Sequence, residues 1–249
     1  MGKLDGKRAL VTGAASGIGE EIVKCFAAEG ADLGLLDLSG DAAAALADAM
    51  SGTHGVKTAT AQADVSDEAA VVPAIERISA ALGGIDILVN CAGIDNTGPL
   101  EEMSVATWDQ MMAVHLRGSF LCIRTVLPGM KQRQWGRIIN FSSQLAHKGA
   151  PSMVHYCAAK AGVIGMTRAL AYEVGGEGIT VNCINPGPID TPLLRSIPQD
   201  WLDVKLGELP MKRFGKTSEV APTALLLATD EGGYYLGASM NMNGGDYMI

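Results

Sequence analysis

Short apolar segments alternate with longer segments of helical periodicity along the whole chain. The apolar segments predict strands near 8–12, 32–37, 57–62, 85–91, 137–141, 179–184 and 238–242. The segments between them predict helices near 17–29, 41–50, 67–81, 105–132, 153–175 and 217–229. Pro73 falls within the third helix, so that helix either starts late or is kinked.

This alternation predicts an α/β protein with a single-domain Rossmann fold. The strands are too apolar to face water, so we expect a doubly wound, seven-stranded parallel sheet with helices on both faces. No linker or charge block divides residues 1–249, which favours one domain. Ligands of such folds collect at the carboxyl ends of the strands, where the polar and glycine-rich motifs of this chain also fall.

Composition excludes several classes of function. A net charge of −8 disfavours a nucleic-acid partner, which needs a basic surface. Apolar residues make up 48% of the chain, yet no apolar run approaches the roughly 20 residues of a membrane span. The N-terminal segment lacks the pattern of a secretory signal, so we expect a cytoplasmic protein without a membrane partner.

The cysteines and histidines show no metal-ligand spacing, so no metal site is expected. Buried reduced thiols are expected at Cys25, Cys91, Cys122, Cys157 and Cys183. The histidines are His54, His115, His147 and His155.

A glycine-rich turn, TGAASGIG, follows the first predicted strand and opens the first helix. Gly13, Gly17 and Gly19 allow the backbone to approach a pyrophosphate, which the N–H groups of that helix then hold. Ser16 and Ile18 belong to the same turn. The turn therefore predicts a dinucleotide cofactor.

Tyr156 and Lys160 are four residues apart on a predicted helix and so share one face. A free phenol has a pKa of about 10, and lowering it by about three units requires about 4 kcal/mol. One cation about 4 Å away, at an effective dielectric near 20, supplies roughly that amount. We therefore expect Lys160 to lower the pKa of Tyr156 and make the phenol a general acid or base. Ser142 and Ser143 end a strand thirteen or fourteen residues upstream.

These motifs together resemble the short-chain dehydrogenase/reductase family over essentially the whole chain. The resemblance rests on TGAASGIG, on NCAG at 90–93, on Ser143, Tyr156 and Lys160, and on NPG at 185–187. It implies hydride transfer between C4 of a nicotinamide and a carbinol or carbonyl carbon. Tyr156 would then exchange the hydroxyl proton, Lys160 would also hold the nicotinamide ribose, and Ser143 rather than Ser142 would bind the substrate oxygen.

Two residues favour NAD over NADP. Asp37 ends the second strand, where a carboxylate binds ribose hydroxyls and repels a 2′-phosphate. Ser16 stands where NADP-using relatives often carry Arg or Lys. The resemblance implies further cofactor contacts from Asp64, Val65, Asn90, Ala92, Gly93, Pro186, Gly187, Ile189 and Thr191. Asn90 could instead stabilise the sheet, and Thr191 could cap a helix.

His115 departs from the family, which usually has asparagine at this position. That asparagine interrupts a helix and holds a water that links the lysine to solvent. Neutral histidine can also donate and accept a hydrogen bond, so we expect His115 to take part in this relay. A packed histidine without a catalytic role is the alternative.

Residues 188–216, with a weak helical stretch at 199–207, predict a lid over the substrate. The candidate substrate residues are Asp95, Gln144, Leu145, His155 and Trp201. Their polar members suit a polyol, a sugar or a hydroxy acid, although each could equally be solvated. Lys148 or Arg195 could hold a carboxylate, or could simply be exposed charges.

The sequence leaves three functions open. NAD preference favours oxidation, and hence a secondary-alcohol dehydrogenase. The C-terminal segment NMNGGDYM resembles 3-oxoacyl thioester reductases, which usually prefer NADPH. A non-catalytic dinucleotide-sensing protein is the alternative from another class, although such proteins generally lose the tyrosine or the lysine. The resemblance also implies a homotetramer assembled through the helices near 105–132 and 153–175.

Overall fold

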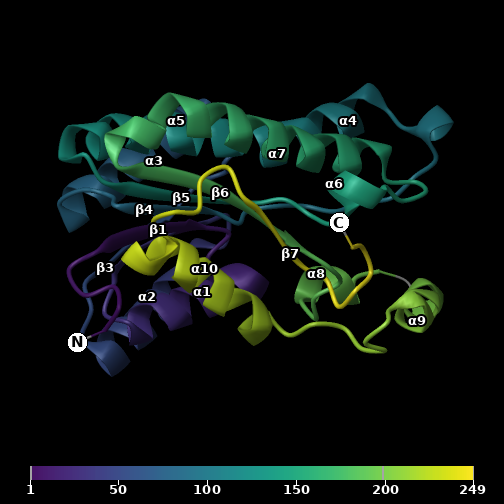
Figure 1. The fold of residues 1–249 in the computed structure, drawn as a ribbon, viewed down its shortest axis with the longest axis horizontal. Helices are drawn as coiled ribbons and strands as arrows, with labels where there is room; N and C mark the ends of the chain where they lie inside the picture. The colour runs from purple at the N-terminus through teal and green to yellow at the C-terminus, as the bar shows by residue number, and fades with distance from the viewer. Residues whose placement is uncertain (1, 198, 249) are drawn as a thin grey trace.

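One parallel seven-stranded sheet forms the centre of the molecule (Figure 1). The computed structural model describes residues 2–197 and 199–248. The strand order is β3-β2-β1-β4-β5-β6-β7. The strands are β1 (Arg8–Thr12), β2 (Asp32–Asp37), β3 (Thr58–Gln62), β4 (Ile87–Asn90), β5 (Gly136–Phe141), β6 (Ile179–Pro186) and β7 (Ser239–Met242).

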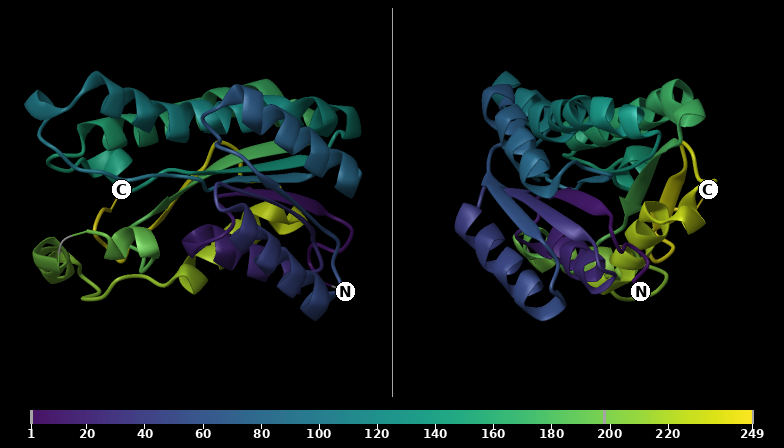
Figure 2. Two further views of the ribbon diagram at one scale, coloured as in Figure 1. Left: turned by 180° about the vertical axis from the view of Figure 1, so that it is seen from behind. Right: turned by 90° about the vertical axis from the view of Figure 1, so that its left-hand side faces the viewer.

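Helices cover both faces of this sheet, as Figures 1 and 2 show. On one face lie α3 (Glu68–Leu82), α4 (Val105–Met112), α5 (Gly118–Arg133) and α7 (Val154–Val174). On the other lie α1 (Gly17–Ala28), α2 (Gly40–His54) and α10 (Thr217–Ala228). Three further helices, α6 (Leu145–Lys148), α8 (Pro192–Arg195) and α9 (Gln199–Glu208), gather at one end of the molecule. The predicted doubly wound α/β fold is confirmed.

Successive residues of each central strand enter two separate hydrophobic cores. Ala9 and Val11 of β1 pack against α1 and α10, whereas Leu10 between them packs against α3 and α5. All three are completely buried. Burial on both faces explains why these strands read as continuous apolar segments. No helix in the described residues is long and apolar enough to cross a membrane.

The winding direction of the chain reverses between β1 and β4. From β1 the chain proceeds to β2 and β3 on one side, and from β4 it proceeds to β5, β6 and β7 on the other. Thr12 and Asn90 are paired at the carboxyl ends of β1 and β4. The connections after these two strands leave in opposite directions, which opens a crevice for a ligand at this end of the sheet.

The structure corrects the expected helices at three places. The helix expected near 105–132 is divided, because a π-helical turn at Ala113–Arg117 separates α4 from α5. α3 begins at Glu68 with Asp67 as its cap, so Pro73 does not delay its start. Helix α6 was not predicted, since four residues are too few to show periodicity.

Gly34 on β2 offers a test of this packing. A Cβ at Gly34 would lie 2.4 Å from Cγ2 of Ile78 on α3, too close for any side chain. We expect Gly34→Ala to lower the free energy of unfolding by about 1–3 kcal/mol, because α3 must move away from the sheet. Urea unfolding measures the change.

Gly52→Ala is the matched control for this substitution. Gly52 lies within α2, where a Cβ would meet no atom of the described chain within 4 Å. There the same change should raise the free energy of unfolding by about 0.4–1 kcal/mol. Equal stability of Gly34→Ala and the unsubstituted chain would contradict the packing described above.

Candidate active site

A cavity of about 510 Å³ opens at the carboxyl ends of the central strands. Ser143, Tyr156, Lys160 and His115 all line it, although they come from separate parts of the chain. Ser143 follows β5, Tyr156 and Lys160 lie on α7, and His115 lies in the π-helical turn. The structure therefore brings together the four residues that the sequence predicts to be catalytic.

The two adjacent serines have different contacts. Ser142 donates its hydroxyl hydrogen to the backbone carbonyl of Lys160 at 2.8 Å, so it ties β5 to α7. Ser143 Oγ accepts a hydrogen bond from the N–H of Leu145 at 3.1 Å, which leaves its hydroxyl hydrogen available. The hydroxyl of Ser143 also lowers the pKa of Tyr156 through a side-chain hydrogen bond. Contacts alone thus separate a structural serine from one that faces the tyrosine.

The pKa of Tyr156 is shifted in the direction opposite to expectation. Burial, together with the charge of Asp95, raises the pKa of Tyr156 well above its ordinary value. Burial also lowers the pKa of Lys160 to about 8. The Lys160 ammonium donates to the carbonyl of Phe141 at 2.8 Å and lies 5.6 Å from the centroid of the Tyr156 ring. The prediction that Lys160 by itself makes the phenol acidic is wrong, because loss of hydration destabilises the phenolate more than this cation stabilises it.

His115 is buried and neutral. Burial and the nearby Lys160 lower its pKa well below the ordinary value. Its Nε2 lies 2.7 Å from the carbonyl oxygen of Ile94 and 3.3 Å from the N–H of the same residue. In the tautomer that the shorter contact favours, Nε2 carries the proton and donates it to that oxygen. Nδ1 is then an acceptor, and it has no partner among the described residues. The ring also packs edge-on against Tyr156 at 5.4 Å, so His115 is both a packed side chain and an available acceptor.

A groove of about 400 Å³ continues from this cavity along the glycine-rich turn. Ile18, Gly93 and Thr191 line both spaces, so the two are continuous. The predicted cofactor residues that line the groove are Gly13, Ser16, Gly17, Ile18, Gly19, Asp37, Asp64, Val65, Ala92, Gly93 and Thr191. Pro186, Gly187 and Ile189 line the larger cavity together with Tyr156 and Lys160.

Asn90 lines neither space. Its Nδ2 donates to Asn140 Oδ1 at 2.8 Å, so its visible contact joins β4 to β5. Thr191 caps a helix and also borders the groove. Its hydroxyl accepts from the N–H of Leu194 at the start of α8, and the residue also borders the groove.

The backbone of the glycine-rich turn fits a pyrophosphate. Gly13 has a φ of 65°, and a Cβ there would lie 2.8 Å from Cα of Ala92. A Cβ at Gly19 would lie 2.0 Å from the carbonyl oxygen of Gly13. Ser16, the cap of α1, makes no side-chain hydrogen bond to that helix, so its first N–H groups remain open to an anion.

Asp37 fits the ribose end of such a cofactor. Its two carboxylate oxygens accept from the N–H groups of Ala15 and Ser39, both at 2.9 Å, which fixes the side chain in the groove. Each oxygen keeps a further lone pair for a ribose hydroxyl. Asp64 at the end of β3 is held by the N–H and the hydroxyl of Ser66 at 2.8 and 2.7 Å.

Four of the five candidate substrate residues line the larger cavity. These are Asp95, Gln144, Leu145 and Trp201. His155 does not, because it is fully buried and its Nε2 is bonded to Asn96 Oδ1. Among the residues that the structure describes, no group of His, Cys, Asp or Glu side chains is arranged to hold a metal.

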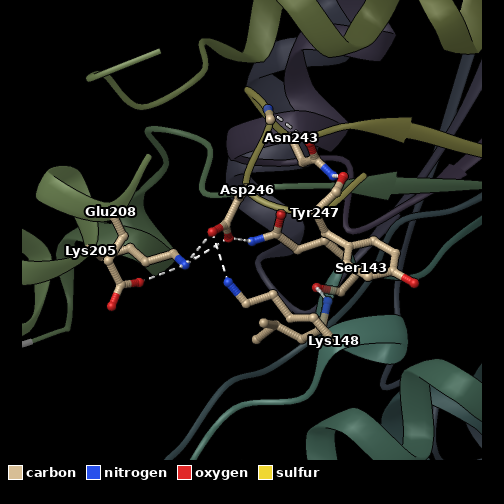
Figure 3. A network of polar contacts seen from close by, with 10 residues as sticks. Ser143, Lys148, Lys205, Glu208, Asn243, Asp246 and Tyr247 are labelled. Carbon is tan, nitrogen blue, oxygen red and sulfur yellow. Dashed lines mark hydrogen bonds and ion pairs between the residues drawn. The ribbon is translucent and has the colours of Figure 1, made fainter. Parts of the chain in front are cut away.

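The C-terminal segment contributes a residue that the sequence analysis missed. Asp246 accepts hydrogen bonds from Lys148 on α6 at 2.8 Å, from Lys205 on α9 at 2.7 Å, and from Gln144 (Figure 3). The Asp246 side chain is only 3% exposed. Gly244 and Gly245 precede it at φ of 64° and 86°, and such a glycine pair is the one sequence signal for the turn that returns the chain to the cavity.

Comparison with known proteins agrees with this arrangement. Residues 13–246 match the family model described as enoyl-(acyl carrier protein) reductase. The chain is 37% identical to 2-dehydro-3-deoxy-L-rhamnonate dehydrogenase (NAD(+)) of Sphingomonas sp. (strain SKA58), covering 98% of this chain and 96% of that protein. It is 40% identical to D-threitol dehydrogenase of Mycolicibacterium smegmatis, with 98% and 94% covered. The crystal structure of levodione reductase matches with a TM-score of 0.93 at 33% identity, covering 97% of this chain and 98% of that one.

Proposed function

Because the chain belongs to the short-chain dehydrogenase/reductase family of oxidoreductases, we propose that it interconverts a secondary alcohol and a ketone with NAD(H). The observation that carries this proposal is the convergence of Ser143, Tyr156 and Lys160 in a cavity that continues into the glycine-lined groove. A nicotinamide bound there would take up or release the hydride and, when oxidised, add a positive charge. Ser143 and Tyr156 handle the oxygen and the proton.

Tyr156 exchanges the proton of the substrate hydroxyl. Because its pKa is raised above the ordinary value of a phenol, Tyr156 is protonated at neutral pH and can donate directly to a carbonyl oxygen during reduction. During oxidation it must first lose its proton, which requires positive charge nearby. Lys160 supplies part of that charge below its pKa of about 8. Ser143 donates its free hydroxyl hydrogen to the substrate oxygen and offsets the charge that develops there.

We assign His115 to the proton relay. It lies beside Tyr156 and takes the place of the asparagine usual in the family. Its unpartnered Nδ1 accepts a hydrogen bond from a water that passes protons between Lys160 and solvent.

NAD is the proposed cofactor, and oxidation is the proposed direction. Asp37 lies where a 2′-phosphate would meet a fixed negative charge. One relative carries NAD(+) in its name, and another is a D-threitol dehydrogenase. A secondary alcohol is the corresponding substrate class.

Residues 188–216 are proposed to close over the substrate as a lid. Leu193, Leu194 and Trp201 from this segment line the cavity. We further propose a homotetramer assembled through α4, α5 and α7. The side chains of Val105, Phe120 and Val154 on these helices are 76%, 46% and 42% exposed, which leaves apolar surface for a second copy.

A 3-oxoacyl thioester reductase is the second candidate. It is favoured by similarity to 3-oxoacyl-[acyl-carrier-protein] reductases, such as FabG of Thermotoga maritima at 38% identity. Asp37 disfavours the NADPH that such reductases usually prefer. A non-catalytic dinucleotide sensor needs neither the tyrosine nor the lysine, and both are in place here.

A panel of secondary alcohols with NAD⁺ tests the proposed activity. We expect NADH formation with at least one alcohol. Tyr156→Phe should lower the rate of NADH formation about 100-fold or more, because phenylalanine has no hydroxyl group to exchange the proton. Ser143→Ala should lower the rate of NADH formation about 100-fold as well. Ser142→Ala is the matched control, since it loses only its bond to α7 and should keep activity within about threefold. NAD⁺ binding without turnover of any alcohol, ketone or acetoacetyl thioester would favour the sensor.

Asp37→Asn tests the choice of cofactor. It keeps the shape of the side chain but removes the charge, so the ratio of kcat/KM for NAD⁺ to that for NADP⁺ should fall about tenfold or more. Asp48→Asn removes a charge from the exposed face of the adjacent helix α2 and should leave the ratio unchanged. A parallel change in both variants would show that general charge, not the ribose contact, sets the preference.

His115→Ala and His115→Asn test the relay together. The alanine variant should lower kcat about tenfold with little change in NAD⁺ affinity, because it removes the acceptor but not the groove. The asparagine variant restores the usual residue of the family and should retain most of the activity. If both variants turn over at the unsubstituted rate, His115 is only a packed side chain.

A further inference from the structure

The larger cavity has a wall formed by two lysine side chains, in addition to Lys160 at its catalytic end. Lys148 on α6 and Lys205 on α9 both line the cavity, and both donate to Asp246 in the C-terminal segment (Figure 3). At the catalytic end, the carboxyl group of Asp95 is close enough to Tyr156 to raise its pKa. A substrate in this cavity therefore lies between a carboxyl group at one end and two ammonium groups at the other.

The charges of the lysine wall do not balance within the protein interior. Asp246 is 3% exposed and Lys205 is 8% exposed, so this pair is enclosed. Lys148 adds a second cation at 30% exposure. The fourth member, Glu208, lies 3.3 Å from Lys205 but is 57% exposed, so solvent screens most of its charge. Counted without Glu208, the wall has one more positive than negative charge, and Glu208, which also lines the cavity, offsets part of that excess.

Lys148 also has unused hydrogen-bond donors. An ammonium carries three N–H groups, and among the described residues that of Lys148 has Asp246 as its one hydrogen-bond acceptor. Although burial opposes it, bonding to Asp246 raises the pKa of Lys148 above its ordinary value, so the group stays charged. Asp246 itself is fixed by Lys205 and Gln144, which holds the Lys148 ammonium in one place.

The neutral polar groups of the cavity are less available to a substrate. Gln144 donates its side-chain N–H to Asp246, and its remaining oxygen Oε1 is fully buried. Asp95 Oδ1 is fully buried as well, and His155 lies outside the cavity. Lys205 already donates to Asp246 and Glu208, so the free N–H donors that an anionic group meets here are mainly those of Lys148.

We propose that the substrate is a hydroxy acid, whose carboxylate binds Lys148 and Lys205 while its carbinol carbon lies at Tyr156. This assignment rests on the proposed alcohol dehydrogenase function and names its substrate class. Lys148 is the binding residue with the most free donors. Asp246 is a positioning residue, because it acts by holding the two ammonium groups and the lid helix α9 beside the cavity.

The test compares hydroxy acids with their methyl esters, in which a methyl group replaces the negative charge. The series is 3-hydroxybutanoate, 4-hydroxypentanoate and 5-hydroxyhexanoate, which places the carboxylate at increasing distance from the carbinol. We expect one acid to exceed its ester in kcat/KM by about tenfold or more, and this preference to weaken as ionic strength rises. The ester should show no such dependence on salt.

Lys148→Met should lower kcat/KM for that acid about tenfold, mainly through KM, and leave the ester unchanged. Lys148→Arg should restore much of the preference, because it restores the positive charge. Asp246→Asn should also reduce the ratio of kcat/KM for the acid to kcat/KM for the ester, since a carboxylate no longer holds the ammonium groups. Lys24→Met is the matched control on the exposed face of α1 and should change kcat/KM for neither the acid nor the ester.

Two results overturn the inference while leaving the proposed function intact. One is oxidation of every ester as fast as its acid. The other is a preference for acid that Lys148→Met does not reduce. Oxidation of neither acids nor esters, with none of the neutral alcohols turned over, would instead remove the proposed dehydrogenase function itself.

Discussion

A lysine ammonium kept in the protein interior governs the chemistry of this fold. Lys160 is 6% exposed, and the carbonyl of Phe141 at the end of β5 accepts its hydrogen bond at 2.8 Å. Burial lowers its pKa to about 8 and raises the pKa of neighbouring Tyr156 well above its ordinary value. Both groups are therefore held in a state that a further positive charge would change strongly. Proteins of this family use nicotinamide dinucleotides, and the oxidised form of such a cofactor would add a positive charge beside this pair.

The surrounding elements keep this pair dry and correctly turned. Ser142 fastens α7 to the end of β5 through the carbonyl of Lys160 itself. The π-helical turn at Ala113–Arg117 brings His115 edge-on to the Tyr156 ring, which an uninterrupted α-helix would not allow at the same register. Asp37 performs a similar task in the groove, because it anchors the glycine-rich turn before any ribose binds. Packing and preorganisation are thus achieved by the same side chains.

Charge is also distributed along the substrate cavity. The carboxyl group of Asp95 lies at the end near Tyr156, and the ammonium groups of Lys148 and Lys205 lie along the wall formed by α6 and α9. Asp246 joins this wall to the C-terminal segment. The C-terminal segment, α9 and α6 are therefore connected through one carboxylate, so the shape of the cavity depends on contacts between distant parts of the sequence.

Local patterns were sufficient for the fold and for the centre of the site. Apolar segments buried on both faces identified all seven strands, and the spacing of Tyr156 and Lys160 placed them on one helix face, because periodicity and spacing act within a few residues. Tertiary structure alone decided the direction of the Tyr156 pKa, the separation of Ser142 from Ser143, and the removal of His155 from the cavity. The contact of Lys148 with Asp246 also depends on tertiary structure, since the two residues are 98 positions apart in sequence. Hydration and charge at a buried group depend on every element packed around it, and no local stretch of sequence contains that information.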